Sequence, residues 1–418
     1  MSLLSLKSRI IIPTNWDMVP IGKALISSQY GTSQGNSKTG VPVVGMRNLQ
    51  NGKVVFNDLP FVVIDETEKE RLLLHDGDIL LNRTNSYDLV GKVGYVEKAI
   101  EAVFASYLVR LKVDKKKSDP RFVAVWLTSF WAEQMLKKIA TRAVSQVNLN
   151  PTEFKKFCLI PVPPLPEQKA IADLLSAWDE AIEKTERLIQ AKKKSFKRLL
   201  NDLIHQGRSN HTWKSFNLSD LCYSISRKNE ENNTNILTSS AQNGLVSQLE
   251  YYNKNVSAEN ITGYYLLKKG EFAYNRSSAK GYPYGATKRL DRYEKGVLST
   301  LSLCFALRPD APCESDFLLH IFESGAVHRE LRTVCQEGAR SHGLLNITKA
   351  DFLGIKLFLP SQEEQQKIQS VLNTAQKEID LLKQLAEKYK TQKRGLMQKV
   401  LTGQWRIRPE IVERYKEA

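Results

Sequence analysis

The chain has 418 residues and a composition typical of folded globular proteins, with 42% hydrophobic and 25% charged residues. This length exceeds what a single hydrophobic core usually organises, so it predicts two or more domains. The net charge of +16 favours a polyanionic partner, nucleic acid first, with solubility alone as the other explanation.

The five cysteines form no Cys-x-x-Cys pair; they are Cys158, Cys222, Cys304, Cys313 and Cys335. This spacing argues against a zinc ribbon or a disulfide framework, and it fits the reduced cytoplasm, where we expect the chain. Lys7 and Arg9 interrupt the N-terminal apolar stretch, and no window of about 18 residues is apolar throughout. We therefore expect neither a signal peptide nor a membrane span.

The first part of the chain is predicted to be a mixed α/β domain. Five segments have strand composition: residues 41–47, 53–58, 77–83, 92–98 and 106–113. Residues 121–140 then show helix periodicity, with Phe122, Trp126 and Met135 near one side. The proline-rich stretch 160–166 ends this part, because proline breaks a strand ladder and starts a helix well.

A long helix is predicted next, over residues 165–206. Its apolar residues alternate steps of four and three, which keeps one seam on one helix face, the coiled-coil pattern. The predicted pairing positions are Ile171, Leu175, Trp178, Ile182, Ile189, Phe196, Leu199 and Leu203. At 1.5 Å per residue, this helix would be roughly 60 Å long.

The whole layout then repeats. Residues 361–403 carry the same seam, at Ile368, Leu372, Ile379, Leu382, Leu396 and Val400. Matching residues such as Trp16 and Trp213 lie 197 positions apart, and the segment 72–84 matches 266–278 at a shift of 193. A period this long indicates a duplicated domain and not a solenoid, whose periods run about 20–50 residues. Because both copies lie in one chain, an internal helix pair is favoured over a dimerisation stalk.

The second globular part has the same kinds of element. Residues 270–276 and 299–307 have strand composition, and residues 316–335 have helix periodicity. Residues 205–211 are the predicted linker, and we expect weak order in the first 12 and the last dozen residues. The predicted domain limits are 1–160 and 208–358 for the globular parts, 161–207 and 359–405 for the helices, and 406–418 for a tail.

Three features together carry a resemblance to a known family. They are the start of the first long helix, PLPEQKAI, its copy after residue 358, and the GDILLNR segment with its counterpart. On these residues the chain resembles the specificity subunit of type I restriction-modification enzymes, along essentially its whole length. The second copy departs from the motif, with LPSQEEQQKI where the first has PPLPEQKAI.

The resemblance implies two similar target-recognition domains, each followed by a long helix. The helices would pair as an antiparallel coiled coil, giving pseudo-twofold symmetry. Each domain would read one half of a split, asymmetric target in double-stranded DNA. The helices would set the spacing and dock two methyltransferase (M) subunits, which restriction/translocase (R) subunits would join. This chain would then be non-catalytic and bind no cofactor, with S-adenosylmethionine, Mg²⁺ and ATP on its partners.

The predicted helix pair has the dimensions of a ruler for DNA. Equivalent groove faces of a DNA duplex lie about 34 Å apart. Helices of this length could hold the two globular domains at that separation. A four-residue insertion within 184–195 should therefore change the tolerated spacer between half-sites and leave their bases unchanged.

Two groups of polar residues are candidate DNA contacts, because base edges in the major groove are read by Arg, Asn, Gln, Ser and similar side chains. The first group follows a strand in each copy: Asn82, Arg83, Thr84 and Asn85, then Asn275, Arg276, Ser277, Lys280 and Tyr282. The second follows a helix in each copy: Arg142, Ser145, Gln146 and Asn148, then Arg340, Ser341, His342 and Asn346. The alternative for both groups is a polar turn or helix cap that only supports the fold.

A basic run lies on the first long helix, at Lys192, Lys193, Lys194, Lys197 and Arg198. A solvated helix face explains it as well as phosphate contact does.

The sequence carries no recognisable catalytic motif. A P-loop, a Gly-x-Gly-x-x-Gly turn after a strand and the Asn/Asp-Pro-Pro-Tyr/Phe of adenine methyltransferases are all missing, and no metal site is predicted. The alternatives to a specificity subunit are a solitary DNA-modifying enzyme with an atypical site and a basic coiled-coil scaffold.

Overall fold

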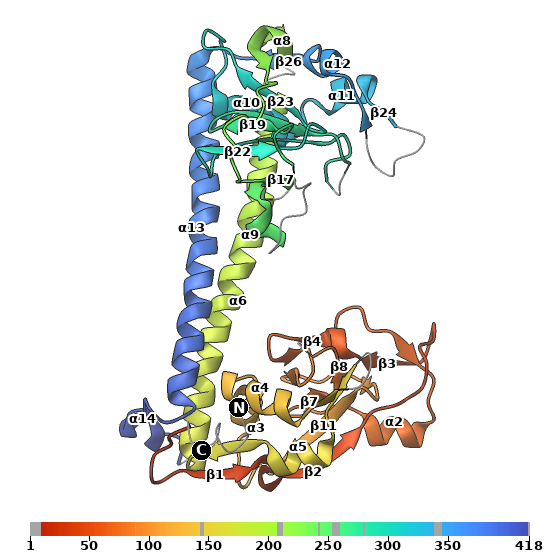
Figure 1. The fold of residues 1–418 in the computed structure, drawn as a ribbon. Coiled ribbons are helices and arrows are strands. Elements are labelled where there is room, and N and C mark those ends of the chain that lie inside the picture. Colours follow the sequence, from red (N-terminus) through yellow and green to blue (C-terminus); the bar gives the residue numbers. More distant parts are fainter. Residues whose placement is uncertain are drawn as a thin grey trace. The chain divides into compact units, whose positions relative to one another are not determined.

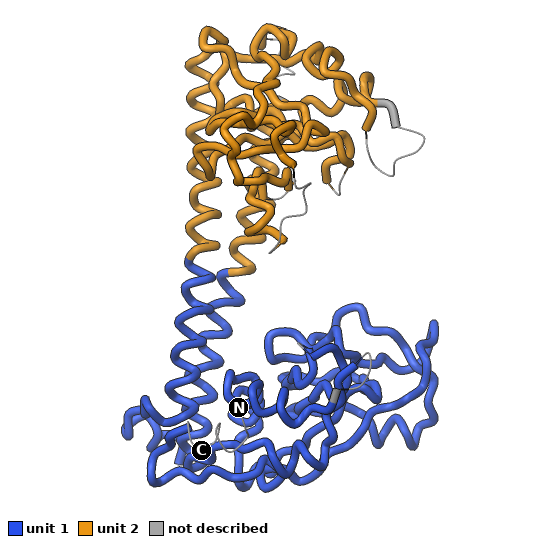
Figure 2. The backbone as a smooth tube through the Cα atoms, in the orientation of Figure 1, with its two compact units in different colours: residues 1–185, 385–418 blue, residues 186–384 orange. Residues whose placement is uncertain are grey.

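The computed structural model describes residues 10–87, 89–142, 146–206, 212–240, 243–252, 260–278, 281–337 and 345–416. The chain divides into two units, coloured separately in Figure 2: unit 1 holds residues 1–185 and 385–418, and unit 2 holds residues 186–384. Each unit combines a mixed α/β globular part with a stretch of each of two long helices (Figure 1), α6 (Leu165–Asn201) and α13 (Gln362–Val400). The predicted fold class, mixed α+β with two long helices, is confirmed.

The globular part of unit 1 is built on a six-stranded sheet in the order β2-β11-β7-β9-β5-β4. Its strands are β2 (Leu25–Tyr30), β11 (Leu108–Val113), β7 (Ile79–Asn82), β9 (Val93–Tyr95), β5 (Lys53–Val54) and β4 (Leu49–Gln50). A second sheet has three strands in the order β10 (Val103–Phe104), β3 (Val41–Val44) and β6 (Phe61–Val62). Strand β7 is buried at every position, which its continuous apolar run Ile-Leu-Leu requires.

The turn that leads into β7 is repeated in unit 2. Gly77 and Gly270 have φ of +91° and +86°, a left-handed conformation that favours glycine. The acid after each glycine, Asp78 or Glu271, accepts a hydrogen bond from the backbone N–H three residues earlier, at 3.0 and 2.7 Å. The matching sequences of the two copies therefore form the same turn.

Unit 2 has a four-stranded antiparallel sheet in the order β16-β23-β20-β21. Its strands are β16 (Cys222–Ser224), β23 (Leu303–Leu307), β20 (Phe272–Asn275) and β21 (Ala286–Arg289). Two strand pairs accompany this sheet: β17 (Leu237–Ser240) with β18 (Gly244–Ser247), and β19 (Tyr265–Lys268) with β22 (Lys295–Leu298). Stacked Phe272 and Phe305, with ring centroids 5.3 Å apart, hold the sheet against the core of this unit.

Two helices that the sequence predicts as continuous are each broken. The segments are α3 (Pro120–Leu127) and α4 (Phe130–Ile139) in unit 1, and α10 (Ser315–Ser324) and α11 (His328–Val334) in unit 2. Ser129 starts a new helix, because its side chain accepts a hydrogen bond from the N–H three residues later at 3.2 Å. Gly325 ends α10 in the left-handed conformation, with φ of +74°. The prediction of two unbroken helices was wrong, because local capping outweighed the continuous apolar pattern.

In unit 1 the stretches of the two long helices pack antiparallel. The rings of Trp178 and Tyr389 meet edge to face, with centroids 5.8 Å apart. The Asp179 carboxylate pairs with the Lys393 ammonium at 2.5 Å. The C-terminal end of α13 then joins the core around the start of α6, where Leu401 is fully buried.

Unit 2 contains the other two helix stretches, again antiparallel. Lys192 of α6 pairs with Glu378 of α13 at 2.7 Å. Further along α6, Leu200 shares a hydrophobic core with Ile368, which lies nearer the start of α13. Contacts at later positions of α6 are therefore made to earlier positions of α13, as expected for antiparallel helices.

None of the predicted pairing residues is exposed. The buried ones are Ile171, Leu175, Ile189, Ile368, Leu372, Ile379 and Val400, and the half-buried ones are Trp178, Ile182, Phe196, Leu199, Leu203, Leu382 and Leu396. The ends of the seam also belong to the globular cores, since Ile171 and Leu175 join that of unit 1 and Leu372 joins that of unit 2. These positions therefore connect each helix to its own globular part.

The C-terminal segment differs from expectation. Residues 409–413 form the short helix α14 (Pro409–Glu413), and the Tyr415 hydroxyl donates to Asp173 Oδ2 at 2.6 Å. The prediction of weak order was wrong for residues 407–416, because Asp173 on α6 binds Tyr415 and Ile407 packs against the core of unit 1. Residues 1–9 and 207–211 lie outside the described part of the chain, and the domain limits given above stay a prediction.

Candidate nucleic-acid interface

A corner of polar side chains follows β7 in unit 1. Arg83 Nε donates to the backbone oxygen of Ser106 at 3.1 Å, and Arg83 Nη1 donates to Asn148 Oδ1 at 3.2 Å. The guanidinium also lies over the ring of Tyr30, 4.9 Å from its centroid. Three contacts therefore orient this arginine, while Tyr30 keeps about half of its surface exposed.

A small sheet brings the two candidate groups of unit 1 together. Strand β13 (Val147–Asn148) lies between β12 (Thr141–Arg142) and β8 (Thr84–Asn85), all antiparallel. The Thr84 hydroxyl donates to Asn148 Oδ1 at 3.2 Å, so this oxygen accepts from two side chains. Asn148 and Gln146 are exposed beside them. Residues far apart in the chain thus form one polar surface.

Unit 2 builds a related corner from its own copies. Arg276 Nε donates to the backbone oxygen of Leu301 at 2.7 Å. The Arg276 backbone oxygen accepts from the N–H of Leu345, the residue before Asn346, at 2.8 Å, whereas that of Arg83 accepts from the N–H of Leu149, the residue after Asn148, at 2.7 Å. Leu345 belongs to β25 (Leu345–Asn346), which pairs with β24 (Gln336–Glu337) and leaves Asn346 exposed. Each unit therefore holds a half-buried arginine whose Nε donates to a backbone oxygen.

The asparagine before each arginine supports the turn. Asn82 is only 1% exposed, and its Oδ1 accepts from the Thr84 N–H at 3.3 Å. Asn275 Oδ1 likewise accepts from the Ser277 N–H at 3.0 Å, and its Nδ2 donates to the Ser239 oxygen at 3.3 Å. Neither amide is free to reach a base edge unless the turn opens. The structure thus gives these two residues a supporting place, whereas the sequence predicts contact.

Two further candidates are occupied by neighbours. The Tyr282 hydroxyl donates to Glu323 Oε2 at 3.0 Å, and burial, followed by the Glu323 charge, raises the pKa of this phenol. Asn85 Nδ2 lies 3.5 Å from the sulfur of Met46. Ser277 is exposed. Five candidates lie outside the residues or side chains that the structure describes, Ser145, Lys280, Arg340, Ser341 and His342, and so does the side chain of Arg142.

Sequence reasoning missed a pair of glutamines that attach each long helix to its globular part. Gln168 Oε1 accepts from the Asp119 N–H at 3.0 Å, and Gln168 Nε2 donates to the Pro163 oxygen at 2.8 Å. Gln365 repeats this with the Glu314 N–H at 2.9 Å and the Pro360 oxygen at 3.1 Å. Both glutamines are fully buried. The signal was present, because Gln168 and Gln365 are 197 positions apart in the two helix starts.

The acid before each glutamine holds a tryptophan. Trp16 Nε1 donates to Glu167 Oε2 at 3.1 Å, and Trp213 Nε1 donates to Glu364 Oε1 at 3.3 Å. In unit 1, Arg406 also binds Glu167 through two hydrogen bonds of 2.6 and 2.8 Å. Both side chains of the Glu-Gln dipeptide therefore position the helix, which explains why the motif at the helix start contains these two residues.

The described residues offer little that resembles a catalytic centre. They contain no group of three or more His, Cys, Asp and Glu side chains placed to hold a metal ion. Burial raises the pKa of the Cys158, Cys222 and Cys304 thiols to about 12, which leaves them poor nucleophiles.

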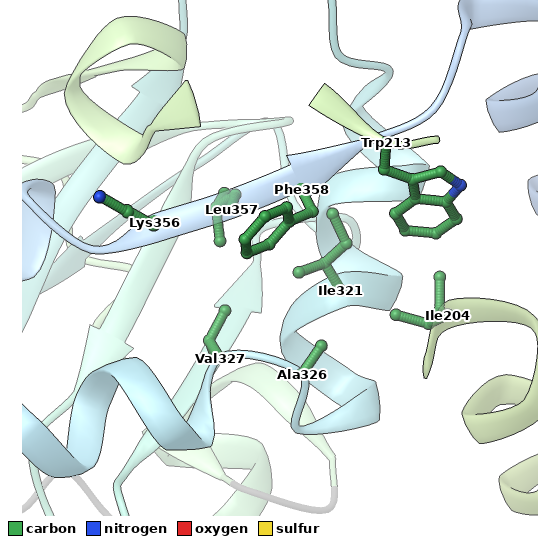
Figure 3. Close-up of a pocket in the computed structure, with 8 residues that line it drawn as sticks. All are labelled: Ile204, Trp213, Ile321, Ala326, Val327, Lys356, Leu357 and Phe358. Carbon is green, nitrogen blue, oxygen red and sulfur yellow. The ribbon is translucent and has the colours of Figure 1, made fainter. Parts of the chain in front are cut away.

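An apolar cavity in unit 2 is shown in Figure 3. Its walls include Trp213, Ile321 and Phe358, with the side chain of Lys356 at one edge. The volume is about 10 Å³, near the minimum for a single water molecule. It is therefore a packing gap and too small for a cofactor. Among the described helices, none combines the length and apolarity that crossing a bilayer requires.

Comparison with known proteins identifies similar domains. Residues 15–193 match the family model described as the type I restriction modification DNA specificity domain. The putative type I restriction enzyme MjaX specificity subunit of Methanocaldococcus jannaschii is 32% identical over 216 residues, which cover 50% of each chain. The EcoBI specificity subunit of Escherichia coli is 24% identical over 189 residues, covering 42% of this chain and 38% of that one. The chain thus spans about half the length of the curated relatives it matches.

Solved structures extend the likeness of fold. The type I restriction-modification S subunit from M. genitalium has a TM-score of 0.54 and 14% identity, with 93% of this chain and 96% of that chain covered. A second structure, from work on complex assembly and conformational transition of the type I R-M system, has a TM-score of 0.53 and 16% identity, with 93% and 97% covered. At this identity the likeness concerns the fold.

Proposed function

We propose that the chain is the DNA-recognition subunit of a type I restriction-modification complex. The proposal is supported by the match of residues 15–193 to the type I specificity domain and by the 32% identity to the MjaX specificity subunit over half of each chain. Each unit would read one half of a bipartite, asymmetric target in double-stranded DNA. The long helices would set the separation of the half-sites and dock two methyltransferase subunits.

The observation that carries this proposal is the corner built twice, once around Arg83 and once around Arg276. An arginine fork is suited to guanine, whose O6 and N7 it can contact together. Fixing Nε on a backbone oxygen, at 3.1 Å in unit 1 and 2.7 Å in unit 2, lowers the entropy lost on binding. The surroundings differ, because the Arg83 guanidinium also contacts the Tyr30 ring and Asn148 Oδ1, contacts that Arg276 does not repeat among the described residues. Unlike corners favour unlike half-sites.

Partners and cofactors follow from the same proposal. The chain would act without chemistry of its own, so methyltransferase subunits would bring S-adenosylmethionine. Where the complex also cleaves, restriction/translocase subunits would bring ATP and Mg²⁺. The net charge of +16 supports DNA as the ligand, since a polyanion is attracted to such a surface.

Binding of the purified chain to DNA tests the proposal. Phosphate contacts predict that log K falls steeply as log [salt] rises between about 50 and 200 mM. Adding methyltransferase subunits and S-adenosylmethionine should then produce methylation at one split sequence. A flat salt dependence would support the scaffold alternative. Methyl transfer or cleavage by the rigorously purified chain alone would support the solitary enzyme.

A further inference from the structure

The basic run on α6 is not used by the two corners. Lys192 is the exception within it, because its ammonium pairs with Glu378 at 2.7 Å and so belongs to the helix pair. The other four, Lys193, Lys194, Lys197 and Arg198, are exposed and have no carboxylate partner within the described residues. We call these four residues the α6 ridge.

Helix geometry places the α6 ridge on one side of the helix. At about 100° per residue, the four positions span an arc of about 140°. The apolar residues Ile189, Phe196 and Leu200 lie outside this arc, about 20–60° beyond its Lys193 edge, and Phe196 and Leu200 pack into the core of unit 2. No acidic residue occurs between Gln190 and Asn201, so nothing along this stretch neutralises the ridge.

The ridge is not required for helix pairing. The positions 197 residues later in α13 are Lys390, Thr391, Arg394 and Gly395, so two of the four cations are replaced there. Lys390 is moreover paired with Glu387 at 3.0 Å. That helix nonetheless packs against α6 in unit 1. Four unpaired cations on one helix stretch repel one another, so their concentration on α6 points to an external anion.

We propose that the α6 ridge binds DNA phosphates without reading sequence. The inference rests on the proposed function, which supplies DNA as the ligand. A protein partner fits less well, because the exposed side chains of this stretch are Gln190, Ala191, Ser195 and the four cations, with no aromatic or large apolar anchor. Lysine and arginine side chains free of carboxylates are what phosphate contacts use.

The test is the salt dependence of binding to a mixed-sequence duplex, with the full chain. One variant carries Lys193→Gln, Lys194→Gln, Lys197→Gln and Arg198→Gln. The matched control removes four exposed unit 2 lysines that already have carboxylate partners, namely Lys269, Lys295, Lys367 and Lys383, each changed to Gln. Thermal unfolding of both variants checks that the fold is kept.

The ridge variant is expected to lower the slope of log K against log [salt] by about one for each phosphate that it no longer binds, about three to four in total. The control is expected to keep the slope of the unaltered chain, and the methylated sequence should be unchanged in both. A ridge variant with the slope of the control would overturn the proposal. So would unchanged DNA binding combined with loss of methyltransferase-subunit binding, which would make the ridge a protein interface. If the unaltered chain itself showed no steep slope, the proposed function would fail first.

Discussion

Gln168 and Gln365 show how single side chains join a helix to a domain. Each amide replaces water around a buried backbone N–H and a proline carbonyl that has no strand partner. A buried group left without its partner costs about 1–3 kcal/mol. These two residues therefore matter to the position of each helix, although neither contributes to the apolar seam.

Changing Gln168 to Ala, or Gln365 to Ala, should destabilise the unit that contains it by about 1–3 kcal/mol. Alanine has the higher helix propensity, so a loss comes from the buried hydrogen bonds and from the packing of the removed side chain. Urea unfolding measures the effect, with exposed Gln190→Ala on α6 as the control for propensity. Equal stability of the Gln168 and Gln190 variants would show that the buried amide is dispensable.

We expect His320 to make the stability of unit 2 depend on pH. Its imidazole is buried and contacts Asn373 Oδ1 at 3.0 Å, with Asp316, Glu323 and Arg289 nearby. Burial lowers its pKa below the ordinary value of 6.5. The unfolded chain then binds a proton that the folded chain does not, so stability falls as pH drops from about 6.5 toward the lower folded pKa.

The variant His320→Gln should flatten this dependence, because glutamine does not titrate. The measurement is the urea midpoint at a series of pH values below about 6.5. Exposed His75→Gln, which removes a histidine from the surface of unit 1, is the control and should keep the slope. An unaltered slope in His320→Gln would mean that other groups cause the acid sensitivity.

At the level of elements, periodicity predicted the long helices well. Helices α6 and α13 begin near the predicted prolines and polar caps. They are long because a seam with steps of four and three continues for about ten turns in each copy, which agrees with the predicted length of roughly 60 Å. The helices broken at Ser129 and Gly325 could not be predicted from periodicity, since a cap leaves the apolar pattern unchanged. The order around Tyr415 was also missed, because its partner Asp173 lies 242 positions away.

The length of α6 is expected to set the spacing between the two half-sites. A four-residue insertion between 184 and 195 advances α6 by about 6 Å and about 400°, which nearly restores the helix face. The tolerated spacer between half-sites should lengthen while both half-sites stay the same. A two-residue insertion rotates the following residues by about 200° and should impair folding or assembly. Mapping of methylated bases checks both, and altered half-site bases after the four-residue insertion would contradict the ruler.

For the molecule as a whole, duplication is the property most visible in the sequence. Matching tryptophans, glutamines and glycines in the two copies make the same hydrogen bonds and turns in each unit. What the sequence could not provide is which polar residues are free. From the sequence, the adjacent residues Asn82 and Arg83 are equally good candidates for DNA contact. In the structure, Asn82 is 1% exposed, whereas Arg83 lies beside Tyr30 and Asn148. That distinction depends on contacts with residues remote in the chain.

The central claim is that two unlike corners read two unlike halves of one target. Genome-wide mapping of methylated adenines tests it most directly, in hosts carrying the unaltered chain, Arg83→Lys or Arg276→Lys with the same methyltransferase subunits. Lysine keeps the charge and loses the fork, so each variant should relax one half-site, at a cost of about 1–3 kcal/mol in discrimination, and leave the other intact. A single uninterrupted or palindromic target, or two variants that alter the same bases, would contradict the account.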